Sequence, residues 1–224
     1  MDYFFRHTPD PKTNISMAMV WGFLIIYLIF VYKFRNKEKL LKAQLIFVTL
    51  VEISLIIWYY QGQAMFLTEG LPLYHCRIAG FLIPIAYFAK KYKLANYFAY
   101  LGIIGPIVAY TIPDPSKYMW PHITNVTYIC AHTMLIASGI MIVVIKRMDL
   151  DLNYIIKNTL IMNAIILIAN KMIGANYGYM SSLPDSIGIK VPSILLLVAI
   201  SFLLVVCINA LDKLSYKLKK KKYI

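Results

Sequence analysis

Charged residues are scarce in this chain of 224 residues, and acidic ones especially so. Only 15% of the residues are charged and 60% are apolar, whereas soluble domains contain about 25% charged and roughly 45–50% apolar residues. This composition excludes an ordinary water-soluble domain. Cysteine is also rare. Cys76, Cys130 and Cys207 lie in apolar stretches without CxxC spacing, which excludes a disulfide framework and a cysteine-rich metal site.

The sequence also lacks Ser/Gly-rich linkers, low-complexity segments and internal repeats, so we expect one integral membrane domain over residues 1–224. It contains long apolar runs instead, and about 20 apolar residues suffice for a helix to cross the bilayer. Backbone groups in lipid must be paired within the protein, and the runs are too long and unalternating for a barrel. The sequence therefore predicts an all-α polytopic membrane bundle of seven transmembrane helices, near residues 16–32, 43–60, 71–89, 94–112, 122–145, 154–173 and 190–211.

The Lys and Arg residues predict the orientation of this bundle. Sixteen of the 23 fall on one side of it, in residues 33–42, 90–93 and 146–147 and in the tail from residue 213. The opposite side holds only Arg6, Lys12, Lys117 and Lys190. Because cytoplasmic loops carry the excess of positive charge, the N-terminus is predicted outside and the C-terminus in the cytoplasm.

The formal net charge of +13 would suggest nucleic-acid binding in a soluble protein. Here the basic residues lie beside apolar runs, so the membrane surface is the better electrostatic partner. We therefore predict that the tail KLKKKKYI binds anionic lipid headgroups, and that nucleic acid is not a partner.

Polar and ionisable side chains concentrate in the outer half of the predicted bundle, although each charge costs about 2.5–3.5 kcal/mol near the bilayer centre. Their common depth predicts a polar cavity. The alternative is that they only tie helices together, since interhelical hydrogen bonds contribute about 0.6 kcal/mol apiece. The residues assigned to substrate binding are Glu52, His75, Arg77, His122, Asn125, Tyr128, Asn170, Lys171, Asn176 and Tyr177.

Cys76 is the candidate nucleophile, because its neighbours His75 and Arg77 can supply positive charge that favours a thiolate. Adjacent helical residues point about 100° apart, so His75 is poorly placed to take the thiol proton. A base on another helix is preferable, and His132 lies at the required depth. Asn125 and Tyr128 share a stripe with His132 and could orient its ring. Glu52 could take that orienting role instead, or pair with Arg77.

A metal site is a further alternative. His75, His122 and His132 could combine with Glu52 and Asp114, but no HxxxH or HxxE spacing places two of these ligands on one helix face. The prediction is therefore that the protein uses no metal and no cofactor.

Four sequence segments resemble the YwaF-like integral membrane family of bacteria. They are LPLYHCRIAG (71–80), TIPDPSKYMWPH (111–122), AH (131–132) and NKMIGANYGYM (170–180). That family is similar to a vertebrate transmembrane phospholipid acyltransferase and, more remotely, to androgen-induced membrane hydrolases of fatty-acid esters. The resemblance implies a Cys nucleophile and a His partner, which fall here on Cys76 and His132. The Lys-, Ile- and Asn-rich composition is typical of a low-GC bacterium, so we expect a multi-pass protein of the bacterial plasma membrane.

These observations predict a lipid acyltransferase or acyl-ester hydrolase that acts on a membrane phospholipid or lysolipid. Arg77 and Lys171 would bind the headgroup phosphate, and Asn170, Asn176 or Tyr177 would donate to the oxyanion. A non-catalytic protein that binds or transports a lipid or small solute is the alternative function.

Overall fold

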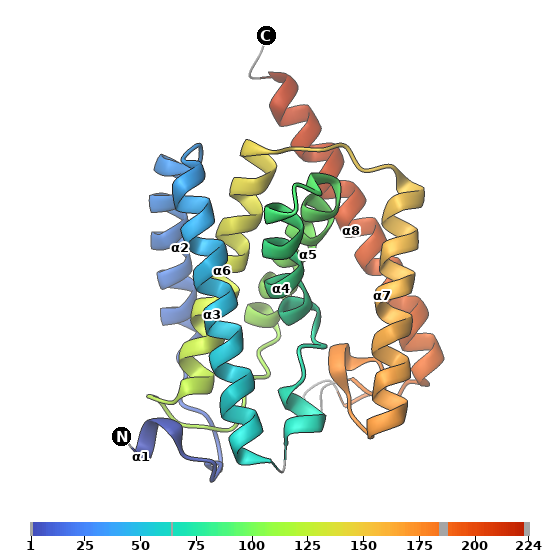
Figure 1. Cartoon of the computed structure of the whole chain (residues 1–224). Coiled ribbons are helices and arrows are strands. Elements are labelled where there is room, and N and C mark those ends of the chain that lie inside the picture. Colours follow the sequence, from blue (N-terminus) through green and yellow to red (C-terminus); the bar gives the residue numbers. More distant parts are fainter. Residues whose placement is uncertain (1, 64, 184–187, 222–224) are drawn as a thin grey trace.

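The computed structural model describes residues 2–63, 65–183 and 188–221, and all regular structure in this part of the chain is helical. The bundle in Figure 1 confirms the all-α polytopic fold. Its elements are α1 (Asp2–Phe5), α2 (Met17–Phe34), α3 (Glu38–Gly62), the π-helix η1 (Phe66–Gly70), α4 (His75–Phe88), α5 (Tyr92–Thr111), α6 (Ile123–Ile145), α7 (Leu152–Ile173), the 3₁₀-helix η2 (Tyr177–Tyr179) and α8 (Ser193–Lys221).

Helix boundaries follow local capping chemistry. The side chains of Ser16, His122 and Asp151 accept backbone N–H bonds at the start of α2, α6 and α7. Helix α7 ends at Gly174, whose φ of 67° lies in the left-handed region that glycine adopts without strain. These caps place both ends of α7 within two residues of the predicted span 154–173.

In the part of the chain that the structure describes, six helices are long and apolar enough to cross a membrane, namely α2, α3, α5, α6, α7 and α8. The third predicted span is shorter than expected. Helix α4 has 14 residues, or about 21 Å of rise, and begins at His75 instead of residue 71. The preceding backbone is extended at Leu71 and Tyr74, and Pro72 disfavours a helical conformation at Leu71.

Helix α5 lies at the centre of the bundle, between α4, α6 and α8. Tyr97, Ala99 and Leu101 on this helix are fully buried. Gly139 lets α6 approach closely, because a Cβ at this position would lie 2.7 Å from the carbonyl oxygen of Ala99. Side chains on α4 and α6 that face α5 therefore pack against a fully buried part of this helix.

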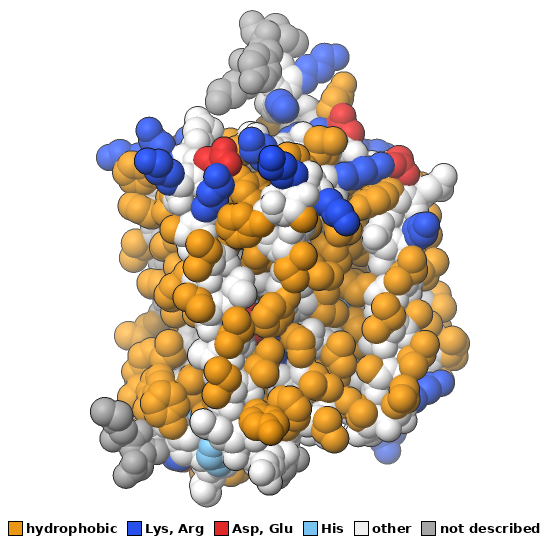
Figure 2. All heavy atoms as spheres, in the orientation of Figure 1, with side chains coloured by type: hydrophobic (Ala, Val, Ile, Leu, Met, Phe, Trp, Pro, Cys, Tyr) orange, Lys and Arg blue, Asp and Glu red, His pale blue; other side chains and the backbone are white. Residues whose placement is uncertain are grey.

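The two ends of the bundle differ in charge. The N-terminal segment, η1 and η2 lie at one end, and the C-terminal part of α8 extends from the other (Figure 1). Lys and Arg side chains gather around the end that carries α8, above an apolar belt (Figure 2). By the positive-inside rule, this charge distribution predicts that the end carrying α8 is cytoplasmic and that the N-terminal end is outside.

Candidate functional site

Cys76 is the second residue of α4, at the outer end of the bundle core. Its side chain is partly buried and packs against α5. A Cβ at Gly105 would lie only 2.6 Å from Sγ of Cys76, so the thiol fits against α5 because this position has no side chain. The close approach fixes the sulfur near the outer half of α5.

His132 on α6 has one defined proton position. Its Nδ1 lies 2.7 Å from the carbonyl oxygen of Tyr128, one helical turn earlier. A carbonyl only accepts hydrogen bonds, so Nδ1 carries the proton of the neutral ring and Nε2 keeps a lone pair. The ring also packs edge-on against Tyr128, with centroids 4.6 Å apart, and against Tyr110 at 5.6 Å. The sequence predicted an orienting group from Asn125 or Tyr128, and the backbone of Tyr128 supplies it.

Both the Cys76 thiol and the surroundings of the His132 imidazole pack on helix α5. The hydroxyl of Tyr128 donates to the carbonyl of Ala109, which lies one turn beyond Gly105 on the same face of α5. Cys76 and the Tyr128–His132 pair therefore pack on neighbouring turns of one helix. Within residues 2–63, 65–183 and 188–221, no hydrogen bond joins Sγ of Cys76 to His132.

Arg77 forms a buried clamp between α3, η1 and α4. Its Nε donates to Oε2 of Glu52 at 2.9 Å, and both side chains are almost fully buried. Its Nη1 donates to the carbonyls of Glu69 at 2.9 Å and Leu71 at 3.1 Å. Nη2 is buried and has no hydrogen-bond partner in the described part of the chain. The sequence left open whether Glu52 pairs with Arg77, and the structure brings the two together.

The clamp explains how an extended segment precedes α4. Non-helical backbone is tolerated at membrane depth only where the protein pairs its polar groups. Arg77 pairs two of these carbonyls, and the Tyr177 hydroxyl accepts from the Leu71 N–H at 2.9 Å and donates to the Leu67 carbonyl at 3.0 Å. Arg77 and Tyr177 therefore hold the backbone that leads into Cys76.

His75 belongs to a separate chain of hydrogen bonds. Its Nε2 lies 2.9 Å from Oδ1 of Asn163 on α7, and Nδ2 of Asn163 donates to Ser201 on α8 at 2.8 Å. Because Oδ1 only accepts, Nε2 of His75 carries the proton. The ring lies against Gly178, where a Cβ would be 2.8 Å from Cε1. His75 thus attaches the start of α4 to α7, α8 and η2.

The other predicted residues at the end of α7 brace the loop that contains η2. Asn170 exchanges two hydrogen bonds with the backbone of Tyr177, at 2.9 and 2.8 Å. Asn176 bonds Ser182 and the Ser181 N–H. Lys171 is exposed at the outer end of α7. The two amides are engaged within the loop, and only Lys171 is presented to the surroundings.

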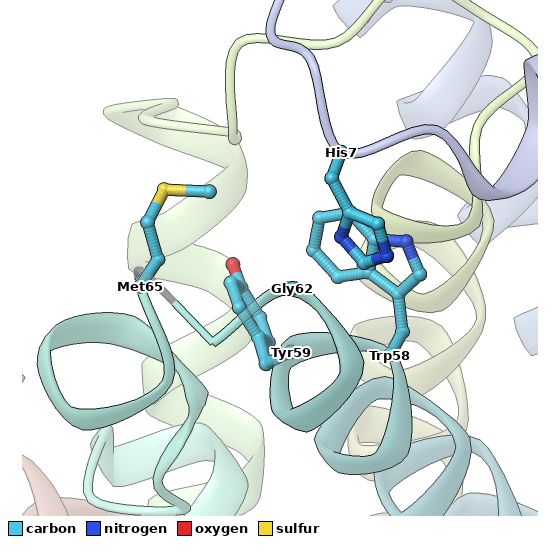
Figure 3. A pocket seen from close by; sticks show the side chains of 5 residues that line it. All are labelled: His7, Trp58, Tyr59, Gly62 and Met65. Carbon is cyan, nitrogen blue, oxygen red and sulfur yellow. The ribbon is translucent and has the colours of Figure 1, made fainter.

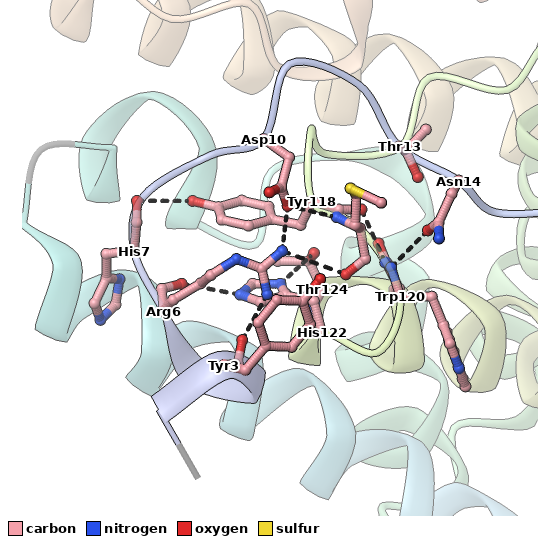
Figure 4. A network of polar contacts seen from close by, with 12 residues as sticks. Tyr3, Arg6, His7, Asp10, Thr13, Asn14, Tyr118, Trp120, His122 and Thr124 are labelled. Atoms are coloured by element: carbon pink, nitrogen blue, oxygen red, sulfur yellow. Dashed lines mark hydrogen bonds and ion pairs between the residues drawn. The ribbon is translucent and has the colours of Figure 1, made fainter.

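His122 and Asn125 belong to an N-terminal strap, formed by residues 5–14 lying against the loop 117–122. His122 Nε2 donates to the Arg6 carbonyl at 2.9 Å, and Asn125 donates to the Tyr118 carbonyl at 3.0 Å. Figure 4 shows the strap crossing the outer end of α6, with Arg6 and Asp10 paired over Tyr118. The sequence did not assign this role to any N-terminal residue, because the contacts join segments more than 100 positions apart.

The strap also closes a small pocket at the outer end of α3. This pocket has a volume of about 50 Å³ and is lined by His7, Trp58, Tyr59, Gly62 and Met65. Figure 3 shows His7 stacked on Trp58 at one side and Met65 at the other. The space has room for a few water molecules and is far too small for an acyl chain.

The His122 contact predicts a pH-dependent stability. Burial lowers the pKa of His122 below its ordinary value of 6.5, since it disfavours the charged ring. The stabilisation that depends on the neutral ring is therefore complete above pH 6.5 and is lost as the pH falls below it. Asp10 stays ionised in this range, because bonds from Met119 N–H and Arg6 lower its pKa.

We expect the thermal unfolding midpoint of the full chain to fall between about pH 8 and about pH 5. Replacing His122 by Gln is expected to make this decrease smaller, because glutamine does not titrate. Differential scanning fluorimetry at matched ionic strength measures both proteins. A decrease of equal size in the variant would contradict the assignment to His122.

In the described residues, no three His, Cys, Asp or Glu side chains lie close enough together to hold a metal ion. The site thus consists of a thiol, an oriented imidazole and a buried ion pair within a helical bundle. These features define a polytopic membrane protein with polar groups concentrated in its outer half. The chain matches the model of the TMEM164 family over residues 6–211 and belongs to this family. Comparison with the curated proteins and with the solved structures found no match.

Proposed function

We propose that this TMEM164 family protein is a membrane-embedded lipid acyltransferase or acyl-ester hydrolase. Cys76 is its nucleophile and His132 its base. The observation that carries the proposal is that both side chains pack on α5. Cys76 packs at Gly105 and the His132 ring packs on Tyr110, with Nε2 of His132 left as the basic nitrogen. The resemblance to YwaF-like proteins supports the same pair, and a bacterial plasma-membrane location belongs to the proposal.

The reaction takes place in two steps. Nε2 of His132 takes the proton of the Cys76 thiol, and the sulfur attacks the carbonyl carbon of a phospholipid ester. A C–S bond forms and the C–O bond of the ester breaks, while the imidazolium returns the proton to the departing lysolipid oxygen. A lysolipid hydroxyl or water then gives its proton to His132 and attacks the thioester carbonyl carbon. A new C–O bond forms, the C–S bond breaks, and the imidazolium returns the proton to the sulfur of Cys76.

The surrounding residues divide between substrate binding and support of the nucleophile. Lys171 is exposed at the outer boundary and can pair with the headgroup phosphate. Arg77 is already paired with Glu52, so its main contribution is to hold the segment before α4. Asn170 and Asn176 support the loop, and donation of their amides to an oxyanion would require this loop to rearrange.

Replacing Cys76 by Ala is expected to abolish covalent labelling of the protein by a lipid-ester probe. Intact-mass measurement after incubation with phospholipid is expected to detect one acyl adduct on the wild-type chain and none on Cys76→Ala. Cys130→Ala and Cys207→Ala are the matched controls, because they remove the other two thiols and leave Cys76 in place.

The outcome separates the enzyme from a non-catalytic lipid binder. Labelling that persists in Cys76→Ala would eliminate the nucleophile. A wild-type protein that retains phospholipid without an adduct, and that produces no lysolipid or fatty acid, would favour the binding function instead.

A further inference from the structure

A second lipid-accessible feature lies at the cytoplasmic end of the bundle, away from Cys76. It is a groove of about 360 Å³ between the end of α2 and the start of α3, lined by Phe30, Phe34, Lys37, Lys39 and Leu40. Helix α2 ends at Phe34 and α3 begins at Glu38, so the groove lies beside the short connection between the two helices.

The walls of the groove are apolar. Phe30 and Phe34 are one helical turn apart, with ring centroids 5.0 Å from each other. Phe30 is 46% exposed, and Leu40 from α3 forms the facing wall. Side chains of this kind match the hydrocarbon of an acyl chain.

The mouth of the groove carries positive charge that other residues do not neutralise. Glu38 lies between the two lysines in sequence, but it pairs with Lys42 at 3.1 Å and with Lys146 at 3.7 Å. In the part of the chain that the structure describes, no ion pair involves Lys37 or Lys39. Their aliphatic stems line the groove, and their ammonium groups can reach the lipid headgroups.

We infer that this groove binds one anionic phospholipid of the cytoplasmic leaflet. The phosphate lies between Lys37 and Lys39, and an acyl chain lies along Phe30, Phe34 and Leu40. Charge complementarity selects an anionic headgroup over a zwitterionic one, and the apolar wall receives the acyl chain. This site is independent of the proposed acyl chemistry at the opposite end of the bundle.

Photocrosslinking tests the site in the full chain. The protein is reconstituted in phosphatidylcholine vesicles that contain a small fraction of phosphatidylglycerol or of phosphatidylcholine, each with a diazirine on one acyl chain. Each lysine near the surface contributes about five-fold to the binding of an anionic lipid. We therefore expect the phosphatidylglycerol probe to label the segment 30–40 at least about five-fold more strongly.

The double variant Lys37→Gln/Lys39→Gln is expected to lose this preference. The matched control Lys90→Gln/Lys91→Gln removes two exposed lysines from another cytoplasmic loop and is expected to keep it. Equal labelling by the two probes, or a preference that survives the Lys37/Lys39 exchange, would overturn the site. If the control variant lost the preference for phosphatidylglycerol to the same extent, the site would also be overturned. The preference would then depend on the total positive charge of the protein and not on the groove.

Competition on the wild-type chain tests the same site without any variant. Unlabelled phosphatidylglycerol is expected to reduce labelling of the segment 30–40 more strongly than the same amount of unlabelled phosphatidylcholine, because only phosphatidylglycerol carries a net negative charge to the two lysines. Equal competition by the two lipids would overturn the site.

Discussion

Replacing His132 by Gln is expected to lower the rate of acyl transfer by about 100- to 10,000-fold, which is the usual contribution of a general base. The reason lies in the surroundings of the thiol. Cys76 packs against an apolar core, and such surroundings disfavour a thiolate unless a base takes the proton. His132 has its Nδ1 proton held by the Tyr128 carbonyl, so only Nε2 can accept one. Glutamine fills a similar volume but cannot accept a proton from a thiol.

Two measurements make this prediction specific. Steady-state release of lysolipid gives the overall rate, and the time course of the acyl adduct on Cys76 separates the first step from the second. His7→Gln is the matched control, because the His7 ring stacks on Trp58 of α3 and has no role in the proposed acyl chemistry. A His132→Gln protein with the wild-type rate of adduct formation would remove His132 from the mechanism and leave Cys76 without its proposed base.

Breaking the Glu52–Arg77 pair is expected to cause the largest loss of stability. Removing one partner of a buried ion pair typically costs about 3–5 kcal/mol, because the other charge stays buried without compensation. Arg77→Gln is expected to cost more than Glu52→Gln. The arginine exchange leaves a buried carboxylate and also removes the donor to the carbonyls of Glu69 and Leu71. The glutamate exchange keeps an oxygen that can accept from Nε of Arg77.

The thermal unfolding midpoint in detergent checks this order. At about 2–4 °C per kcal/mol for a chain of this length, the midpoint falls by roughly 6–20 °C. Lys93→Gln serves as the control, because the Lys93–Asp151 pair is exposed and such pairs contribute about 0–1 kcal/mol. An Arg77→Gln protein as stable as the control would show that the clamp does not hold the segment before α4. The double exchange Glu52→Gln/Arg77→Gln is expected to recover only part of the loss, since the two carbonyls stay unpaired.

The helices could be predicted from the sequence because their apolar runs are long and end at charges, Gly or Pro. The start of the third span could not. The run LPLY is as apolar as a membrane helix, but Pro72 keeps Leu71 extended, and Arg77 and Tyr177 pair the exposed backbone. An apolar run shows that the side chains are apolar. It does not show which distant side chains form hydrogen bonds with the backbone N–H and C=O groups of the run.

The depth of the polar residues was a sound basis for placing them at one end of the bundle, but their roles depend on their partners. Asn170 and Asn176 have the same side-chain chemistry as an oxyanion donor, yet their hydrogen bonds are made within the loop. Gly105 had no polar signal at all, although its missing side chain makes room for the thiol. The catalytic roles of Cys76 and His132 remain predictions, which the adduct and rate measurements test.

The short α4 has a consequence for how the protein enters the bilayer. With 14 residues and an arginine in its first turn, this segment is a poor substrate for independent transfer from the translocon into lipid. The carboxylate that compensates the arginine resides on α3, which is synthesised immediately before it. Helices α3 and α4 are therefore expected to enter the membrane together, as one helical hairpin in which Arg77 and Glu52 are already paired.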